Sequence, residues 1–453
     1  MQPATLPPGP KGNVLLNREI DLRSNILQYL EKNVREYPGI SRIKLGPFHY
    51  VIISDPEMIE QVFMNREVYV KGRDNDNLKF LLGNGLLTNQ GDFWMKQRRL
   101  MQPLFHKQRL QGFVQKIEEC TNDIMTEWKA MPHKTVDIHN EMMKLTLAIV
   151  SSTLMSTNVG GEFRKVSDAL TVVMEGMIDR TRSFVRLPYW LPTGRNMRMK
   201  LNRKTLDATI LSIINNRRKD SKTYDDLLTM LMEVEDADTR ERMTDTQLKD
   251  EVITIFLAGH ETTANAMSFA FYLLAQHPEV RGKINEEVNR VTTGDAMTYE
   301  QLNKLEYTTM VIKEAMRLYP PAWGILREAA KDDVLNGHLI KKGDSIVLPP
   351  YAVQRSERYW PEPEKFDPER FSAERMKGVH RYAYFPFGGG ARLCIGNNFA
   401  MMEMQIIMAL ICRQFSFSLP PDFKLELDAL VTLRPRNGLQ LVLKQEVGTP
   451  TNI

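Results

Sequence analysis

The strongest constraint on the fold of this chain is a long succession of helical patterns. After Asp55-Pro56, apolar residues recur at three-to-four spacing over most of about 260 residues, which is the period of an amphipathic helix. Because such helices must bury their apolar faces against one another, the pattern predicts a mainly α protein. The clearest helical segments are residues 97–128, 142–155, 203–218, 247–276 and 307–318.

Short β-strands are expected near both ends of the chain. Residues 42–54 alternate apolar and polar side chains around Gly46-Pro47, which predicts a hairpin. Residues 334–348 and 438–444 also have strand-like patterns. Residues 1–13 are rich in Pro and Gly, so we expect them to form an extended leader.

Length and composition limit the class of protein. The chain has 453 residues, more than one core usually supports, but no segment between Ile40 and Val442 resembles a linker, so we expect one domain over residues 1–453. The net charge of +4 is too small to indicate a nucleic-acid partner. Three widely spaced cysteines indicate a reducing, cytoplasmic location. The chain has no run of about 18 apolar residues, so no transmembrane anchor is expected.

The most specific local feature is the segment Phe387-Gly-Gly-Gly-Ala-Arg-Leu-Cys-Ile-Gly396. Its three consecutive glycines permit backbone conformations that side chains forbid. Cys394 precedes an apolar periodic run, so it should lie just before or at the start of a helix, where amide N–H groups and the helix dipole stabilise a thiolate. One thiolate is poor zinc chemistry, which needs about four ligands, but it suits an iron held by a porphyrin. The plainer alternative is a buried cysteine beside a glycine turn.

This segment resembles the haem-binding signature of the cytochrome P-450 family, Phe-x-x-Gly-x-Arg-x-Cys-x-Gly. All five fixed positions match, at Phe387, Gly390, Arg392, Cys394 and Gly396. The resemblance implies that the cofactor is haem b (iron protoporphyrin IX) and that Cys394 is its proximal iron ligand. It also implies that Arg392 binds a haem propionate and that Phe387 packs near the sulfur. The family fold is one triangular, mainly α domain with small β-sheets.

Two further positions resemble propionate-binding residues of the family. Trp94-Met-Lys-Gln-Arg98 is similar to its Trp-x-x-x-Arg motif, and Trp94 and Arg98 lie one helical turn apart. Arg327, which follows Tyr319-Pro-Pro321, matches another position that often binds a propionate. For Arg327, a solvated surface role is the alternative.

A Glu-x-x-Arg motif provides a structural prediction. Glu314-Ala-Met-Arg317 places two opposite charges on one helix face, where they can pair. Apolar neighbours indicate that the pair is buried rather than exposed. The resemblance adds Arg370 as the third member of this triad, whose implied role is folding and haem-pocket integrity.

A polar segment interrupts the most apolar helix of the chain. Ala258-Gly-His-Glu-Thr-Thr263 costs helix stability and apolar burial, so packing alone does not account for it. A polar face that meets solvent is the alternative. The segment resembles the oxygen-binding motif of the family's central helix. The resemblance implies that Glu261 and Thr262 are the acid–alcohol pair that delivers protons in oxygen activation, with His260 as a spacer.

Together these motifs imply a haem-thiolate monooxygenase that inserts one atom of O₂ into its substrate. Too few residues follow Cys394 for a reductase domain, so electrons are expected from an external ferredoxin- or flavodoxin-type donor. A basic stretch that could dock the donor consists of Lys96, Arg98, Arg99, Lys107 and Arg109.

The sequence leaves three rival functions open. Within the family, the rival is a peroxide-driven or rearranging haem-thiolate enzyme, although the Glu261-Thr262 pair argues against it. Outside the family, the chain could be a non-catalytic haem-binding sensor, which would not need that pair, or a helical scaffold without cofactor, which would be colourless when purified.

The residues that the resemblance assigns to the substrate pocket are mainly apolar. They predict a lipophilic substrate such as a fatty acid or a terpenoid. Residues 184–192 combine aromatic and basic side chains, which suits either a mobile access lid or a membrane-contacting loop. The candidate pocket residues are residues 78–87, Met174, Phe184, Ala258, Ala322, Trp323 and Ile325.

Overall fold

The computed structural model describes residues 4–12, 25–72, 75–131, 134–156, 161–182, 188–222, 224–236, 239–292 and 296–446. These residues form two compact units. The first unit comprises Met1–Gly72, Ile117–Leu145 and Glu261–Ile453, and the second comprises Arg73–Lys116 and Thr146–His260. Three helices run from one unit into the other: α6 (Val114–Ala130), α7 (Ile138–Met155) and α11 (Asp245–Gln276). That the whole chain acts as one haem domain stays a prediction.

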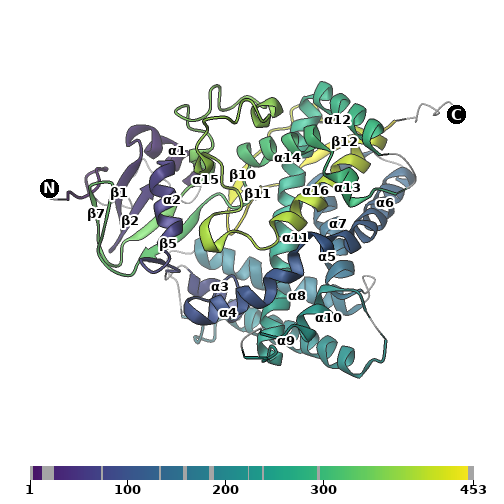
Figure 1. Ribbon diagram of the computed structural model, residues 1–453, viewed down its shortest axis with the longest axis horizontal. Coiled ribbons are helices and arrows are strands. Elements are labelled where there is room, and N and C mark those ends of the chain that lie inside the picture. Colours follow the sequence, from purple (N-terminus) through teal and green to yellow (C-terminus); the bar gives the residue numbers. More distant parts are fainter. Residues whose placement is uncertain are drawn as a thin grey trace. The chain divides into compact units, whose positions relative to one another are not determined.

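The first unit contains a five-stranded sheet, three strands of which are labelled β1, β2 and β5 in Figure 1. Its strand order is β1-β2-β8-β5-β3. Strands β1 and β2 pair antiparallel from Ile40↔Ile53 to Leu45↔Phe48, which confirms the predicted hairpin. Strand β2 then pairs parallel with β8, and β5 pairs antiparallel with β3. The strands are β1 (Ile40–Leu45), β2 (Phe48–Ile53), β8 (Ser345–Leu348), β5 (Ile325–Ala329) and β3 (Tyr69–Val70).

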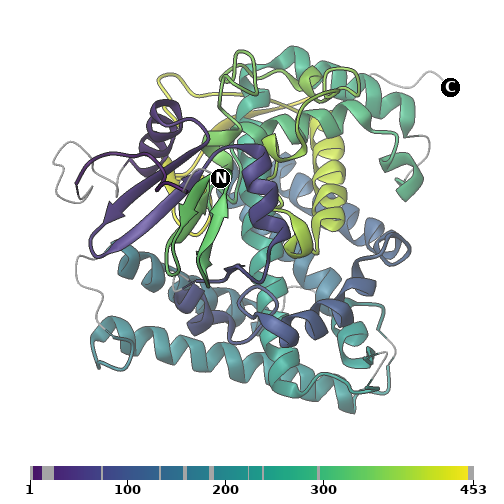
Figure 2. The ribbon, with the colours of Figure 1, turned by 60° about the vertical axis from the view of Figure 1, so that its left-hand side comes forward.

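Two helices cover opposite faces of this sheet (Figure 2). Helix α2 (Pro56–Met64) begins where predicted, because the Asp55 carboxylate accepts hydrogen bonds from the first turn and proline suits a first helical position. Alternate residues of β2 point to opposite faces, so Val51 packs with α2 whereas Ile52 packs with α1 (Ile26–Glu36). This packing holds α2 beside the glycine segment that precedes Cys394.

Three helices of the first unit pack against one another: α12 (Pro278–Val291), α14 (Glu306–Leu318) and α16 (Asn397–Gln414). Helix α12 begins at Pro278, because proline suits a first helical position. Three small sheets and five short helical segments complete the described part of this unit. The sheets are β4-β12-β9 (Thr135–Asp137, Gln440–Gln445, Phe415–Ser418), β10-β11 (Leu427–Ala429, Leu433–Pro435) and β6-β7 (Asp333–Leu335, His338–Ile340). The helical segments are α13 (Tyr299–Leu302), α15 (Pro350–Val353), η4 (Pro368–Phe371), η5 (Arg381–Ala383) and η6 (Gly390–Arg392).

The second unit is helical. Its helices α8 (Gly161–Arg182) and α9 (Gly194–Lys219) pack together, and α9 begins where the Thr193 hydroxyl accepts a hydrogen bond from the backbone of Asn196. The remaining helices are α3 (Asn75–Leu82), α4 (Gly91–Met101), α5 (Lys107–Leu110) and α10 (Leu227–Glu233).

One helical prediction is wrong in detail. The sequence pattern predicts continuous helix over residues 97–128, but α4 ends at Met101 and α6 begins at Val114. Pro103 lies in a 3₁₀ turn at this break, because proline has no N–H to donate and clashes with the preceding turn of an α-helix. The predicted helices 142–155, 203–218, 247–276 and 307–318 all lie within observed helices.

The described part of the leader, residues 4–12, is extended and joined to the first unit. The Thr5 backbone exchanges hydrogen bonds with Gly337 and Leu339, and the Arg42 amide donates to the Pro8 carbonyl at 2.7 Å. Among the described residues, no helix is both long enough and apolar enough to span a membrane.

Candidate active site

The glycine segment before Cys394 is held against α2. Gly390 has φ +61°, and a Cβ at this position would overlap the carbonyl oxygen of Phe63 in α2. Only glycine meets both demands, because other residues rarely adopt this φ and carry the clashing atom. The Cys394 amide donates to the Phe387 carbonyl at 3.0 Å and closes the turn. Cys394 therefore lies on a tight turn three residues before α16 starts at Asn397, as the sequence predicts.

The three cysteines differ in burial. Cys394 is exposed, whereas Cys412 is fully buried and Cys120 is intermediate. Burial raises the pKa of the Cys412 thiol to about 12, and burial together with nearby acidic groups raises the pKa of Cys120 to about 11. These two side chains therefore stay neutral thiols near neutral pH, so Cys394 is the best candidate for a thiolate ligand.

Lys71, Arg327 and Arg392 form a cation cluster in the first unit. The Arg327 side chain is buried, and burial lowers its pKa to about 10. Burial lowers the pKa of Lys71 well below its usual range, and the charges of Arg327 and Arg392 lower it further. Three cations repel one another at close range, so an anionic group near them would be stabilised. Sequence reasoning identified Arg327 and Arg392 but missed Lys71.

The cluster depends on a strand pair that joins distant parts of the chain. Val70 in β3 pairs with Glu328 in β5, so the residues beside them, Lys71 and Arg327, become neighbours. Lys71 belongs to no motif, and only this pairing reveals it. Arg327 is only 7% exposed, so it is not a solvated surface residue.

The donor set of the first unit fits a haem. No group of three or more His, Cys, Asp or Glu side chains suited to a metal ion is found among the described residues. A porphyrin supplies four nitrogen ligands and two propionates, which match one thiolate and a cluster of cations. Phe387, Arg392 and Cys394 lie in this unit together with Glu261, Thr262 and Arg327.

Trp94 and Arg98 lie in the second unit, on α4. Trp94 is buried and Arg98 is half-buried, one turn further along the helix. The predicted one-turn spacing is therefore confirmed, whereas their contact with a propionate stays a prediction.

Glu261 lies in the middle of α11, and its carboxylate is held by a residue that sequence reasoning missed. The Thr432 hydroxyl donates to Glu261 Oε1 at 2.6 Å, and Asn265 Nδ2 donates to the same hydroxyl at 3.0 Å. Burial raises the pKa of Glu261, while the hydrogen bond from Thr432 and the charge of Arg434 lower it. His260 is buried, and its carbonyl accepts a hydrogen bond from Thr146, in keeping with a structural role.

The predicted buried triad is confirmed. Arg317 donates to both carboxylate oxygens of Glu314, at 2.7 and 2.9 Å, and Arg370 lies 3.3 Å from the same carboxylate. All three side chains are buried.

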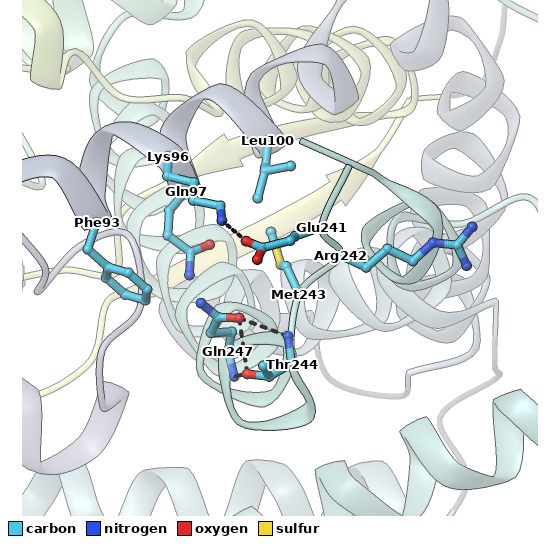
Figure 3. A pocket seen from close by; sticks show the side chains of 9 residues that line it. All are labelled: Phe93, Lys96, Gln97, Leu100, Glu241, Arg242, Met243, Thr244 and Gln247. Carbon is cyan, nitrogen blue, oxygen red and sulfur yellow. Dashed lines mark hydrogen bonds and ion pairs between the residues drawn. The ribbon is translucent and has the colours of Figure 1, made fainter. Parts of the chain in front are cut away.

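The basic stretch is partly neutralised inside the second unit. Lys96 forms an ion pair with Glu241 at the edge of a pocket of about 400 Å³, between α4 and residues 241–247 (Figure 3). Arg99 lies 2.7 Å from Asp236, whose side chain is fully buried. Lys107 and Arg109 are exposed and are the stronger candidates for docking a partner.

The pocket beside Lys96 is lined by neither Trp94 nor Arg98, so it is not the predicted cofactor site.

The candidate substrate residues are divided between the units. In the second unit, Leu87 and Ala258 are exposed, whereas Leu81 and Leu82 are fully buried and belong to the core. In the first unit, Trp323 packs against the cluster around Leu30 and donates to the Leu430 carbonyl. Met174 is buried, and Ala322 and Ile325 are half-buried.

Only part of the predicted access loop can be placed. Phe184 lies outside the described residues, as does the rest of the segment 183–187. The described remainder exposes Trp190, and Tyr189 stacks on Phe80 with ring centroids 4.4 Å apart.

A mainly α fold with small sheets, and a cysteine turn beside a cation cluster, are the features expected of a haem-thiolate protein. The family model for cytochrome P450 matches residues 7–442. Among curated proteins, the chain is 32% identical over 415 residues to cyclooctat-9-en-7-ol 5-monooxygenase of Streptomyces melanosporofaciens, covering 91% of this chain and 90% of that protein. It is 33% identical over 407 residues to pentalenene oxygenase of Streptomyces avermitilis, covering 89% of each.

Solved structures agree with the sequence relatives. The crystal structure of the cytochrome P450DA haem domain has a TM-score of 0.88 and 25% identity, and the match covers 98% of each chain. A crystal structure of cytochrome P450 CYP102L1 has a TM-score of 0.85 and 28% identity, covering 94% of this chain and 99% of that one. The chain belongs to the cytochrome P450 family. It is a monooxygenase, and haem is its cofactor.

Proposed function

We propose that this protein hydroxylates or otherwise oxygenates a terpenoid, with haem b bound through Cys394. The observation that carries the proposal is the exposed Cys394 on its glycine turn, in the same unit as the cations Lys71, Arg327 and Arg392. Phe387 would pack beside the sulfur. The propionates would be bound by these three cations.

The bound haem would supply the oxygen-activating chemistry, in which a thiolate ligand favours O–O cleavage. The chain's own contribution is positioning and proton supply. Glu261 would take up and release the proton at its carboxylate, and burial raises the pKa of this group. Thr262, the next residue on α11, would pass that proton on through its hydroxyl.

The terpenoid class is inferred from the relatives. The two Streptomyces enzymes are named for cyclooctat-9-en-7-ol and pentalenene, both terpenoids. The candidate pocket residues of this chain are mainly apolar, which suits a terpenoid substrate.

The electrons would come from a separate ferredoxin- or flavodoxin-type donor. The cytoplasmic location indicated by the cysteine usage stays a prediction.

A ligand panel tests the substrate class. Cyclic terpenoids and fatty acids of similar size are titrated into the haem-loaded protein, and the low-to-high-spin change of the haem spectrum is recorded. The proposal predicts spin changes for terpenoids at lower concentration than for fatty acids, followed by oxygenated products when a reductase system is added. Tighter binding and turnover of fatty acids would contradict it.

A second experiment tests the cation cluster. Lys71→Met and Arg327→Leu should each lose haem faster to an acceptor protein, by about 10- to 100-fold, because each removes a charge-assisted hydrogen bond to a propionate. The matched control is Lys331→Met, which removes an exposed charge from the same region. Equal haem loss from Lys71→Met and Lys331→Met would remove Lys71 from the proposed site.

A further inference from the structure

Glu261 is held by a hydroxyl that comes from a distant part of the chain. Thr432 lies 171 residues away in the sequence, and its hydroxyl reaches Glu261 Oε1 at 2.6 Å. The Thr432 side chain is buried, at 7% exposure. A hydrogen bond to a carboxylate inside a protein is stronger than one between neutral groups, so this contact fixes the carboxylate.

The backbone around Thr432 is held on both sides. The Thr432 carbonyl accepts a hydrogen bond from the Leu430 amide at 3.1 Å, and the Leu433 amide donates to the Pro321 carbonyl at 2.9 Å. Thr432 directly precedes β11, which pairs with β10. The hydroxyl is therefore presented to α11 from a fixed turn.

Asn265 determines the direction of the hydrogen bonds. It lies one turn beyond Glu261 on α11, is fully buried, and its Nδ2 donates to the Thr432 oxygen at 3.0 Å. A hydroxyl has one proton to donate, and an ionised carboxylate can only accept. Because Asn265 donates to the hydroxyl oxygen, the single Thr432 proton is directed to Glu261.

The positive charge of Arg434, in β11, also lowers the pKa of Glu261, but less than the hydrogen bond from Thr432 does. Arg434 itself lies 3.9 Å from Asp428 of β10, with which it forms an ion pair. Asn265 and Thr432 are uncharged. The hydrogen bond from Thr432 is thus the nearest interaction that favours the ionised form of Glu261.

We infer that Thr432 is a positioning residue for the reaction: it holds the Glu261 carboxylate in one orientation and sets the pH at which that carboxylate ionises. The inference rests on the proposed role of Glu261 as the proton carrier. Asn265 supports the same arrangement by directing the hydroxyl. A purely structural role for Thr432, as a link between the β10-β11 turn and α11, is the alternative that the experiment must separate.

The experiment titrates Glu261 in the haem-loaded resting enzyme. The carboxyl C=O stretch of protonated Glu261 is followed by infrared difference spectroscopy against pH and assigned by its absence in Glu261→Gln. Thr432→Val, which keeps the shape but removes the hydroxyl, should raise the titration midpoint by about 1–2 pH units. Thr432→Ser should restore the wild-type midpoint. Asn265→Leu should give a smaller shift in the same direction, which provides a second test if Thr432→Val folds poorly.

The matched control is Thr121→Val, which removes another fully buried hydroxyl that bonds only within its own helix, to the Ile117 carbonyl. This control should keep the wild-type midpoint. A Thr432→Val midpoint equal to that of wild type, or a shift that Thr432→Ser does not reverse, would overturn the inference.

A parallel turnover assay separates the inference from the proposed function. The turnover rate is measured across pH for the same variants. If Glu261→Gln leaves this rate unchanged, the proposed relay role of Glu261 fails, whatever the titration shows. If Glu261→Gln lowers the rate while Thr432→Val changes neither the pH profile of the rate nor the midpoint, the relay stands and the role of Thr432 fails.

Discussion

Arg317 and Glu314 face each other across one turn of α14, with both carboxylate oxygens bonded to the guanidinium and both side chains at 0% exposure. Arg317 also donates to the Gln354 carbonyl at 2.7 Å, which ties the pair to the segment after α15. An exposed pair of this kind contributes under about 1 kcal/mol, whereas removing one partner of a buried pair leaves an uncompensated charge. The pair is therefore a condition for folding rather than a catalytic group.

Glu314→Ala should destabilise the fold by about 3–5 kcal/mol, because Arg317 and Arg370 would both lose their buried counter-ion. The measurement is the unfolding midpoint together with the haem content of the purified protein. The matched control is Glu369→Ala, which removes a partly exposed partner of Lys283 and should cost under about 1 kcal/mol. A Glu314→Ala variant with normal haem content and slower turnover would instead make the pair catalytic.

Thr262→Ala should uncouple electron consumption from product formation. The variant should still bind haem and substrate and still accept electrons, but product should fall and hydrogen peroxide should rise. A positioned proton donor typically contributes about 10²–10⁴-fold, so the effect should be large. The measurement is product formed per reducing equivalent, with peroxide counted alongside. Coupling equal to that of wild type would mean that another group passes the proton.

Glu251→Gln should change how stability depends on pH. Burial raises the pKa of Glu251 to about 8, although its carboxylate accepts a hydrogen bond from the Leu86 amide at 2.9 Å. In the unfolded chain the carboxyl ionises near pH 4.3, so the wild type loses stability as pH rises from there to about 8. The variant avoids this loss and should gain up to about 4 kcal/mol at pH 8, with no gain below pH 4.

Thermal unfolding of Glu251→Gln across pH 4–9 provides the measurement. The exposed Glu357→Gln serves as control and should follow the wild type at every pH. A Glu251→Gln difference that stays constant across this range would show that Glu251 ionises normally in the folded protein.

Electron delivery should depend on the exposed cations after α4. Lys107→Glu with Arg109→Glu should raise the KM for an acidic carrier, and the effect should shrink as salt rises, since screening shortens to about 8 Å at physiological ionic strength. The measurement is the rate of haem reduction by the carrier at increasing salt concentration. Rates unaffected by salt and by both exposed substitutions would rule out this docking surface.

Arg99→Glu should lower the stability of the fold, because it places a second negative charge beside the buried Asp236.

Patterns among residues close together in the sequence predicted where helices begin and which charges pair within a helix. The starts of α2 at Pro56 and α12 at Pro278 follow from capping and proline rules, and the Glu314–Arg317 pair follows from helical spacing. Pro103 by itself predicts a break in the helix. The apolar residues recur at helical spacing on both sides of it, however, and this spacing predicts one continuous helix.

Contacts between distant segments could not be predicted from one sequence. Lys71 becomes part of the cation cluster only because β3 pairs with β5. Thr432 reaches Glu261 only because the turn before β11 packs against α11. Neither residue belongs to a motif, and strand pairing between segments far apart carries no local pattern.

The most direct test of the central claim is the absorption spectrum of the reduced, CO-bound protein with each cysteine replaced in turn. Wild type, Cys120→Ser and Cys412→Ser should all have the strongly red-shifted Soret band of a thiolate-ligated haem, since burial raises the pKa of Cys120 and Cys412 and keeps their thiols neutral. Cys394→His should bind haem, if at all, with the Soret band at the position of imidazole ligation. A red-shifted band that survives in Cys394→His and disappears in Cys120→Ser or Cys412→Ser would contradict the assignment of Cys394 as the iron ligand.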